Sequence, residues 1–251
     1  MEGIWAVCQG ERHIGELRAQ VVRVVESQAQ IATLALVDSV DEQYVLEQLL
    51  DQHKPPPPVG ADQYHYLMWT PFRYPPLPYG SRFGQRAEPG IFYASLTLET
   101  ALAECAYYRF VFMAGMAEAL PQGRITTEHS TFEARVQTAQ GVALERPPFD
   151  RYRTQISDPT RYSTAQALGQ ALRKAGVAAC TYVSARDALG VNIAVFALPA
   201  IANSQPEALR QWIGVTTADE ASFTLVHSNN PPRCFSKDLF LREQNLPIPV
   251  C

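Results

Sequence analysis

The sequence predicts an α+β protein, because segments with the patterning of strands are interspersed with a few amphipathic helices. Hydrophobic residues make up 47% of the 251 residues, which is enough for a sizeable core. Charged residues make up only 18%, which argues against a disordered chain. The length fits one large domain, or one domain with a small accessory part.

The residues before a run of four prolines at 55–58 are expected to be helical. The apolar residues that recur there at the period of one helix face are Ile14, Leu17, Val21 and Val25. A second helix is expected to begin at Ser39, which forms a capping-box pattern with Glu42. The prolines cannot continue a helix and form a stiff spacer. Residues 1–58 are therefore predicted to be a helical N-terminal extension with a proline linker.

The residue composition changes after the proline linker. Residues 66–74 are aromatic-rich and are expected to form an edge strand, followed by a loop to residue 90. A short strand over residues 90–94 and a helix over 98–113, with Thr97 as its N-cap, come next. The remaining expected strands are 131–136, 177–183, 191–198 and one or two within 212–226, and the remaining expected helices are 163–175, stopped by Gly176, and 206–212. Residues 59–227 would form the main domain, and residues 228–251 an irregular tail.

Composition excludes several classes of function. The net charge is −4 and the isoelectric point near 5.8, without a strong basic patch, so direct binding to nucleic acid is not expected. Residues 1–13 lack the continuous apolar run of a signal peptide, and no apolar run in the sequence is long enough for a membrane span. The cysteines are Cys8, Cys105, Cys180, Cys234 and Cys251. Their scatter is typical of free thiols in a reducing cytosol, so we expect a cytoplasmic protein. The histidines lack metal-ligand spacing, and no catalytic metal is expected.

Polar residues in three segments could carry chemistry. Arg73 and Arg82 stand among aromatic residues and glycines, where a guanidinium could bind phosphate or lie on the surface. Glu104 lies at the edge of the apolar face of its expected helix, where it could contact a sugar or only solvent. Tyr93 could stack on a flat ligand or pack in the core, and Ser184 could bind ligand or satisfy a turn. The residues alone leave each of these alternatives open.

Familiar nucleotide and hydrolase motifs are absent from the sequence. No GxSxG elbow surrounds Ser184, so a serine-hydrolase nucleophile is disfavoured. Neither a P-loop nor a GxGxxG following a strand occurs, so neither a P-loop kinase nor a Rossmann dehydrogenase is indicated.

The order of the three polar segments resembles that of the RES-domain family, named for an arginine, a glutamate and a serine. Arg73 matches the family's arginine on its first strand, and "GSRF" at residues 80–83 is similar to a second arginine motif. Ser81 stands where that motif commonly has a second glycine, and this difference affects the expected shape of the loop more than the expected activity.

Two longer segments complete the resemblance, which covers about residues 64–200. "GIFYASLTLETALAECAYY" is similar to the family's tyrosine strand and glutamate helix, with Tyr93 and Glu104 at the matching positions. "YVSARDALGVNIAVF" is similar to its serine segment, with Ser184 as the serine.

The resemblance implies an ADP-ribosyltransferase-like core, a mixed or split sheet around an NAD⁺ cleft, preceded here by the helical extension. It implies the toxin of a type II toxin–antitoxin system that depletes NAD⁺ by breaking the nicotinamide–ribose bond, as a glycohydrolase or phosphorylase. Arg73 and Arg82 would hold the pyrophosphate, and Tyr93 would stack near the nicotinamide or ribose. Glu104 would stabilise the developing positive charge and Ser184 would orient the ribose or a phosphate. Arg73, Glu104 and Ser184 are thus the expected catalytic residues, and Arg82 and Tyr93 the expected NAD⁺-binding residues.

The expected partners are NAD⁺ as substrate, without a further cofactor, and a cognate antitoxin protein. Two other functions fit the same residues: an ADP-ribosyltransferase that modifies a specific host protein, and a non-catalytic protein that binds NAD or a related nucleotide. The acceptor of the ADP-ribose, the use of NADP⁺, assembly into a homo-oligomer and the role of the N-terminal helices stay open.

Overall fold

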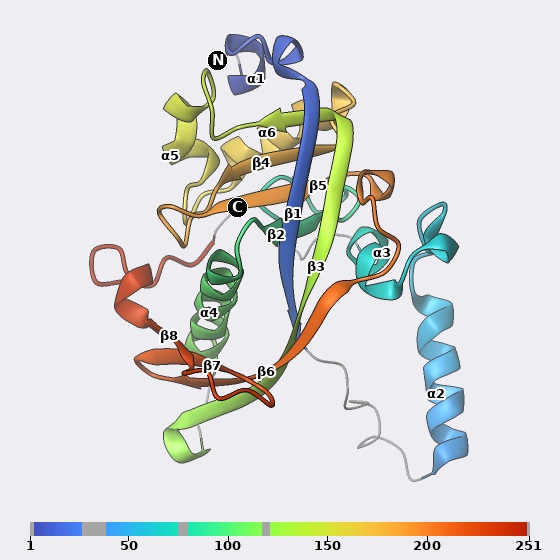
Figure 1. The fold of residues 1–251 in the computed structure, drawn as a ribbon, viewed down its shortest axis with the longest axis vertical. Coiled ribbons are helices and arrows are strands. Elements are labelled where there is room, and N and C mark those ends of the chain that lie inside the picture. The colour runs from blue at the N-terminus through green and yellow to red at the C-terminus, as the bar shows by residue number, and fades with distance from the viewer. Residues whose placement is uncertain (1–2, 27–38, 75–79, 117–120, 250–251) are drawn as a thin grey trace.

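The computed structural model describes residues 3–26, 39–74, 80–116 and 121–249, and it confirms the α+β class (Figure 1). The strands of the described chain form one mixed sheet in the order β1-β2-β5-β4-β3-β6-β7-β8. The strands are β1 (Gly15–Glu26), β2 (Phe92–Ser95), β3 (Arg124–Ala143), β4 (Ala179–Val183), β5 (Val191–Val195), β6 (Glu207–Thr217), β7 (Glu220–Leu225) and β8 (Arg233–Ser236). All pairings within this sheet are antiparallel except that of β3 with β4.

Part of the sheet closes into a ring, because β1 pairs with β3 as well as with β2. The ring runs β1-β2-β5-β4-β3 and back to β1, and its apolar side chains include Val21, Phe92 and Phe132. The long strand β3 also pairs through its first half with β6, which continues into β7 and β8. β1 and β3 run side by side along the long axis, with β6 to β8 toward one end (Figure 1). A closed ring removes exposed strand edges at the centre of the molecule.

The expected helix that starts at Ile14 is wrong, because residues 15–26 form β1. Apolar residues at three- and four-residue steps do not exclude a strand, and the β-branched valines of this segment favour one. β1 pairs with β3 from Leu17 to Glu26. These residues therefore belong to the sheet and not to a helical extension. The second expected helix is confirmed as α2 (Val40–His53), where the Glu42 amide donates to Ser39 Oγ at 3.2 Å.

Two further element predictions are wrong. Residues 66–73 form helix α3 (Tyr66–Arg73) where a strand was expected; the helix buries Met68, and the ring of Phe72 stacks on that of Phe92 at 6.4 Å. Residues 207–212, where a short helix was expected, form the first half of β6, because this segment pairs with β3. The strands expected within 212–226 are confirmed by the second half of β6 and by β7. The expected tail is irregular only in part, since it contains β8 and a 3₁₀ turn at Lys237–Phe240.

The helices and strands nearest the candidate site were predicted correctly. α4 (Leu98–Ala114) begins at Thr97, whose hydroxyl accepts from the Thr100 amide at 3.2 Å. Strands β2, β4 and β5 lie within two or three residues of their expected bounds. α6 (Ser163–Lys174) is followed by Gly176, whose φ of +76° permits the left-handed turn that ends a helix.

Helices cover the sheet on two sides and frame the interior. α4 packs its buried residues, among them Tyr107 and Phe110, against aromatic side chains of β6 to β8. α1 (Ile4–Val7) and α6 pack over β4 in a second cluster that includes Trp5 and Leu172. α5 (Arg153–Ile156) precedes α6 and adds Ile156 to the same cluster.

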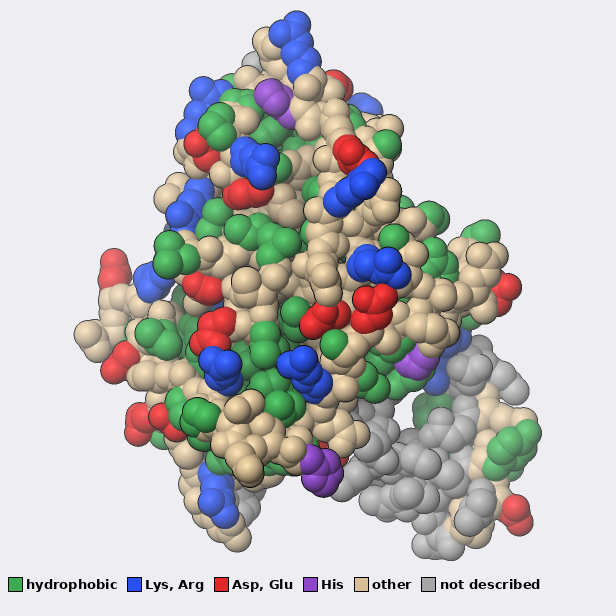
Figure 2. All heavy atoms as spheres, viewed as in Figure 1, with side chains coloured by type: hydrophobic (Ala, Val, Ile, Leu, Met, Phe, Trp, Pro, Cys, Tyr) green, Lys and Arg blue, Asp and Glu red, His purple; other side chains and the backbone are tan. Residues whose placement is uncertain are grey.

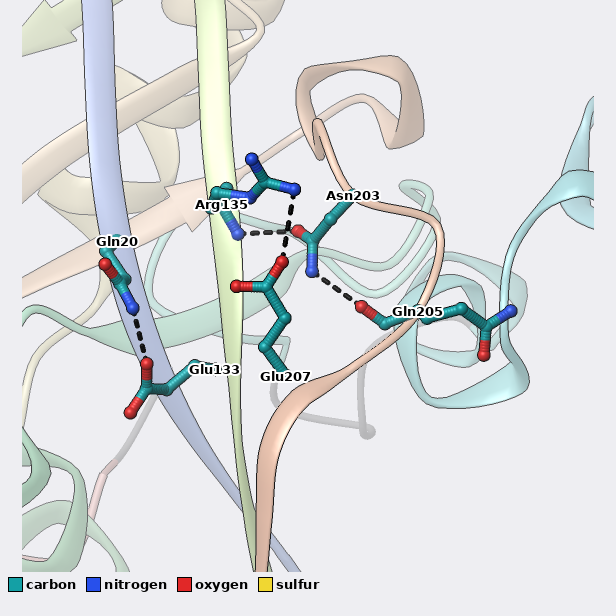
Figure 3. A network of polar contacts seen from close by, with 6 residues as sticks. All are labelled: Gln20, Glu133, Arg135, Asn203, Gln205 and Glu207. Atoms are coloured by element: carbon teal, nitrogen blue, oxygen red, sulfur yellow. Dashed lines mark hydrogen bonds and ion pairs between the residues drawn. The ribbon is translucent and has the colours of Figure 1, made fainter.

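A polar network ties the chain between β5 and β6 to β3 (Figure 3). The Arg135 amide donates to Asn203 Oδ1 at 2.6 Å, and Asn203 Nδ2 donates to the Gln205 carbonyl at 2.6 Å. The Arg135 guanidinium also pairs with Glu207 at 3.1 Å. These contacts position the start of β6 on the outside of the ring.

Charges of both signs are interspersed over the face of the molecule seen in Figure 2, without a large patch of one sign. No helix among the described residues combines the length and the apolar character that crossing a bilayer requires.

Candidate active site

A cavity of about 600 Å³ opens between β1, β2, α4 and the loop that starts at Gly80. This volume lies in the range of small-molecule sites. Its lining includes three of the residues singled out in the sequence, namely Arg82, Tyr93 and Glu104. The structure thus places these three side chains around one hollow.

Glu104 projects from α4 into the wall of this cavity, and its carboxylate is held on one side only. Its Oε1 accepts a hydrogen bond from Ser184 Oγ at 2.6 Å and another from Asn192 Nδ2 at 2.6 Å. Its Oε2 accepts none from the described part of the chain. One oxygen is therefore fixed by the fold while the other is available to a ligand.

Ser184 connects the end of β4 to Glu104. Its Oγ accepts hydrogen bonds from the backbone amides of Arg186 and Asp187 at 3.0 and 3.1 Å, so its own proton is directed to Glu104. Ser184 does not line the large cavity; it lines a separate pocket of about 200 Å³ that also contains Arg186. Its contact with Glu104 is that of a residue that orients the carboxylate.

Asn192 is a site residue that the sequence reasoning did not select. It lies on β5, paired with Tyr182, and it is buried. Ser95 Oγ donates to Asn192 Oδ1 at 2.7 Å, which leaves the amide nitrogen to donate to Glu104. The only signal in the sequence is an amide within an apolar strand, and buried amides require a partner.

Tyr93 anchors the loop at residues 80–84. Its hydroxyl lies 2.9 Å from Ser81 Oγ and accepts from the Phe83 amide at 3.0 Å. Burial raises the pKa of Tyr93 to about 12, so the phenol is neutral at physiological pH. Gly80 has a φ of +75°, and a Cβ at this position would meet the Gly84 carbonyl oxygen at 2.5 Å. The loop therefore depends on both the tyrosine and the glycine.

Arg82 lies in the same loop but turns part of its guanidinium to the protein. One terminal nitrogen donates to the carbonyls of Ile156 and Asp158 at 3.1 and 2.9 Å. The guanidinium carbon lies 4.6 Å from the centre of the Tyr162 ring. These contacts pin the chain after α5 to the cavity and fix the direction of Arg82.

Arg73 is not among the residues that line the cavity, although its neighbours Pro71 and Tyr74 are. It ends helix α3 instead of lying on a strand, and its Nε donates to the Pro55 carbonyl. Its guanidinium lies 5.7 Å from the ring of Trp69. The structure therefore brings Arg82, Tyr93, Glu104 and Ser184 into contact with one site and does not bring Arg73 into it.

Two arginines that the sequence reasoning did not select line the cavity, Arg23 of β1 and Arg109 of α4. Arg23 stands in a segment that was expected to be helical, where its direction could not be predicted. Arg109 lies one turn and a half beyond Glu104 on the same helix.

A cysteine–histidine pair also borders the cavity. Cys105 Sγ lies 3.8 Å from His129 Nδ1, and His129 Nε2 lies 2.7 Å from Thr127 Oγ1. Burial raises the pKa of Cys105 to about 12 and lowers the pKa of His129 to about 4. Both side chains are therefore neutral at pH 7, and the thiol is not an activated nucleophile.

The lowered pKa of His129 predicts a specific dependence of stability on pH. Because the unfolded imidazole is protonated first, the contribution is complete above about pH 6.5 and is lost as the pH falls toward about 4. The loss is about 1.4 kcal/mol per pH unit within this window. Urea unfolding at pH 7 and 4.5 should show a steeper loss for the wild type than for His129→Gln. His13→Gln, at an exposed position, should behave like the wild type, and equal slopes for the wild type and His129→Gln would contradict the assignment.

His, Cys, Asp and Glu side chains within the described segments form no group of three or more that could hold a metal ion.

A half-buried carboxylate with two fixed donors, at the edge of a cavity lined by arginines and phenols, defines a site for a polar, anionic small molecule. Comparison with family models identifies the class of protein. The RES domain model matches residues 57–214, so the chain belongs to the RES-domain family. No curated protein matches the chain significantly. Among solved structures, the M. tuberculosis MbcT–MbcA toxin–antitoxin complex contains a similar chain, with 14% identity, a TM-score of 0.49, and coverage of 87% of this chain and 94% of that one.

Proposed function

We propose that the protein cleaves the nicotinamide–ribose bond of NAD⁺ and acts as the toxin of a type II toxin–antitoxin pair. The observation that carries the enzymatic part is the Glu104 carboxylate, held through Oε1 by Ser184 and Asn192 with Oε2 left to a ligand. The cavity beside it, of about 600 Å³, is large enough for a nucleotide. The toxin role rests on membership of the RES-domain family.

The proposed reaction breaks the bond between ribose C1′ and the nicotinamide nitrogen. The bonding electron pair goes to the ring nitrogen, so that nicotinamide leaves as a neutral molecule and positive charge develops on the ribose. Water or phosphate then forms a new bond to C1′ and loses one proton to solvent. The negative charge of Glu104 stabilises the developing cation and accepts hydrogen bonds from ribose hydroxyls.

The other residues of the site position the substrate in this proposal. Tyr93 is a neutral phenol whose hydroxyl is occupied by the loop, which leaves its ring to contact the nicotinamide or ribose. Arg82 adds positive charge to the lining of the cavity, although one of its terminal nitrogens already donates to two backbone carbonyls. A cognate antitoxin that covers the cavity is the expected protein partner, and a cytoplasmic location follows from a substrate found inside cells.

Product analysis tests the proposal directly. The purified protein is incubated with NAD⁺, with and without phosphate, and nicotinamide and ADP-ribose products are quantified by chromatography. We expect nicotinamide release with stoichiometric free ADP-ribose, or its 1″-phosphate when phosphate is the acceptor. Unchanged NAD⁺ would refute an enzymatic role and favour a binding protein, whereas ADP-ribose attached to a protein would identify a transferase.

The two donors to Glu104 should act as a unit. Ser184→Ala and Asn192→Ala each remove one hydrogen bond to a charged oxygen, worth about 1.5–3 kcal/mol, so each should slow cleavage about 10- to 100-fold. The double variant should lose less than the product of the two effects, because both donors orient the same Oε1. Asn203→Ala, which removes a buried amide of the network in Figure 3, should lower stability but leave turnover unchanged. Strictly multiplicative effects would show that the donors act separately.

A further inference from the structure

Arg23 enters the candidate site from outside the family-matched region. It lies on β1, opposite Phe132 of β3, whereas the RES domain model begins at residue 57. Its guanidinium donates to the carbonyl oxygen of Tyr93, the residue that anchors the loop at Gly80. The N-terminal strand thus delivers a cation to the cavity that the family pattern does not contain.

No carboxylate among the described residues balances the charge of Arg23. Its guanidinium lies 4.9 Å from the centre of the Phe92 ring, and its buried Nε has no acceptor among the described residues. None of the ion pairs within the described segments includes it. Burial lowers the pKa of Arg23 to about 10, which still leaves it charged at pH 7. A buried cation without a counter-charge is costly, so an anion that occupies the cavity would relieve this cost.

Arg109 supplies a second cation to the lining of the cavity, from α4. It follows Glu104 by five residues on α4, a rise of about 7.5 Å along the helix axis. Its Nε is also buried without an acceptor in the described chain, and only Glu26, at 3.6 Å, pairs with it. Glu26 also lines the cavity and is largely exposed, so its charge is screened by solvent.

We propose that Arg23 and Arg109 form the pyrophosphate-binding end of the cavity, for a dinucleotide whose nicotinamide ribose lies at Glu104. This inference rests on the proposed NAD⁺ cleavage and names the part of the chain that recognises the phosphates. Glu104 and Arg109 both line the cavity from α4, so one ligand that fills the cavity can contact both. Arginine forks match phosphate oxygens bidentately, and both arginines line the cavity in which the phosphates would lie.

The assignment replaces part of the expectation from the sequence. Arg73 and Arg82 were expected to hold the pyrophosphate, but Arg73 does not line the cavity and Arg82 gives two hydrogen bonds to backbone carbonyls. Arg23 and Arg109 both line the cavity, and no carboxylate of the described residues pairs with Arg23.

The test measures ADP binding by calorimetry, using the full chain and the variants Arg23→Met and Arg109→Met. Methionine retains an unbranched apolar stem for packing on Phe92 while removing the charge. Each variant should weaken ADP binding about 10- to 100-fold, the loss expected for a charge-assisted contact. Arg18→Met is the matched control on the same strand, because Arg18 is exposed and pairs with Glu16. If Arg23→Met does not fold, Arg23→Lys keeps the charge but lacks the fork and should weaken ADP binding about tenfold.

Binding of NADP⁺, which carries a 2′-phosphate besides the pyrophosphate, is measured with the same variants. ADP binding that is unchanged in both arginine variants, or absent in the wild type, overturns the proposal. Loss of affinity for NADP⁺ alone would assign Arg23 to a 2′-phosphate and also overturn it. Arginine-dependent ADP binding without any cleavage of NAD⁺ would support the phosphate site and refute the proposed reaction.

Discussion

Glu104→Gln is expected to lower the rate of NAD⁺ cleavage by about 10²–10³-fold, because the amide cannot stabilise positive charge on the ribose. The amide oxygen can still accept from Ser184 and Asn192, so the fold around position 104 should persist. The measurement is nicotinamide release at saturating NAD⁺, together with circular dichroism of both proteins.

Glu99→Gln is the matched control for this prediction. Glu99 lies in the first turn of the same helix, is exposed, and faces Arg233 at 3.7 Å on the surface. Its replacement should leave turnover within about twofold of the wild type, because an exposed pair contributes little. Full activity in Glu104→Gln, or an equal loss in Glu99→Gln, would remove Glu104 from the mechanism.

Phe83→Ala is expected to reduce the free energy of unfolding by about 3–5 kcal/mol, the range for truncating a fully buried phenylalanine. The Phe83 side chain has no exposed surface, and its ring lies 4.9 Å from that of Tyr182 and 6.4 Å from that of Phe196. Phe83 also joins the loop at Gly80 to the core under α6, because its amide binds the Tyr93 hydroxyl. Urea denaturation at pH 7 measures the change.

Phe112→Ala provides the comparison for this loss. Phe112 is 54% exposed on α4, so its truncation should cost less than about 1 kcal/mol. If Phe83→Ala and Phe112→Ala were destabilised equally, the loop at Gly80 would not be anchored in the core as described.

Local signals in the sequence predicted the elements that carry Glu104 and Ser184. Thr97 marks the start of α4, Gly176 marks the end of α6, and short apolar runs mark β2, β4 and β5. Each of these signals lies within the segment that it predicts, so it can be recognised without knowledge of the tertiary structure.

The errors fall where distant partners decide the structure. β1 pairs with β3, more than 100 residues away, and this pairing overrides a spacing that also fits a helix. The conformations of α3 and of the first half of β6 were predicted wrongly for the same reason. α3 packs on Phe92 of β2, and β6 pairs with β3. The spacing of hydrophobic residues in a short segment does not show which distant segment will pack or pair with it.

Part of the site was predicted from the resemblance to the family, and its other residues were identified only from the fold. The order of the motifs associated Glu104 with Ser184, and the structure joins them by a hydrogen bond of 2.6 Å. Asn192 and Arg23 were missed because only the register of β5 with β4, and the strand conformation of β1, direct their side chains to the cavity. Arg73 was chosen from the motif alone, and nothing in its own segment indicated its contact with Pro55.

A crystal structure of the Glu104→Gln variant soaked with NAD⁺ would show where the substrate binds. We expect the nicotinamide ribose against position 104, beside Tyr93, and the pyrophosphate between Arg23 and Arg109. NAD⁺ bound elsewhere on the protein, or a cavity that stays empty at saturating NAD⁺, would contradict this expectation.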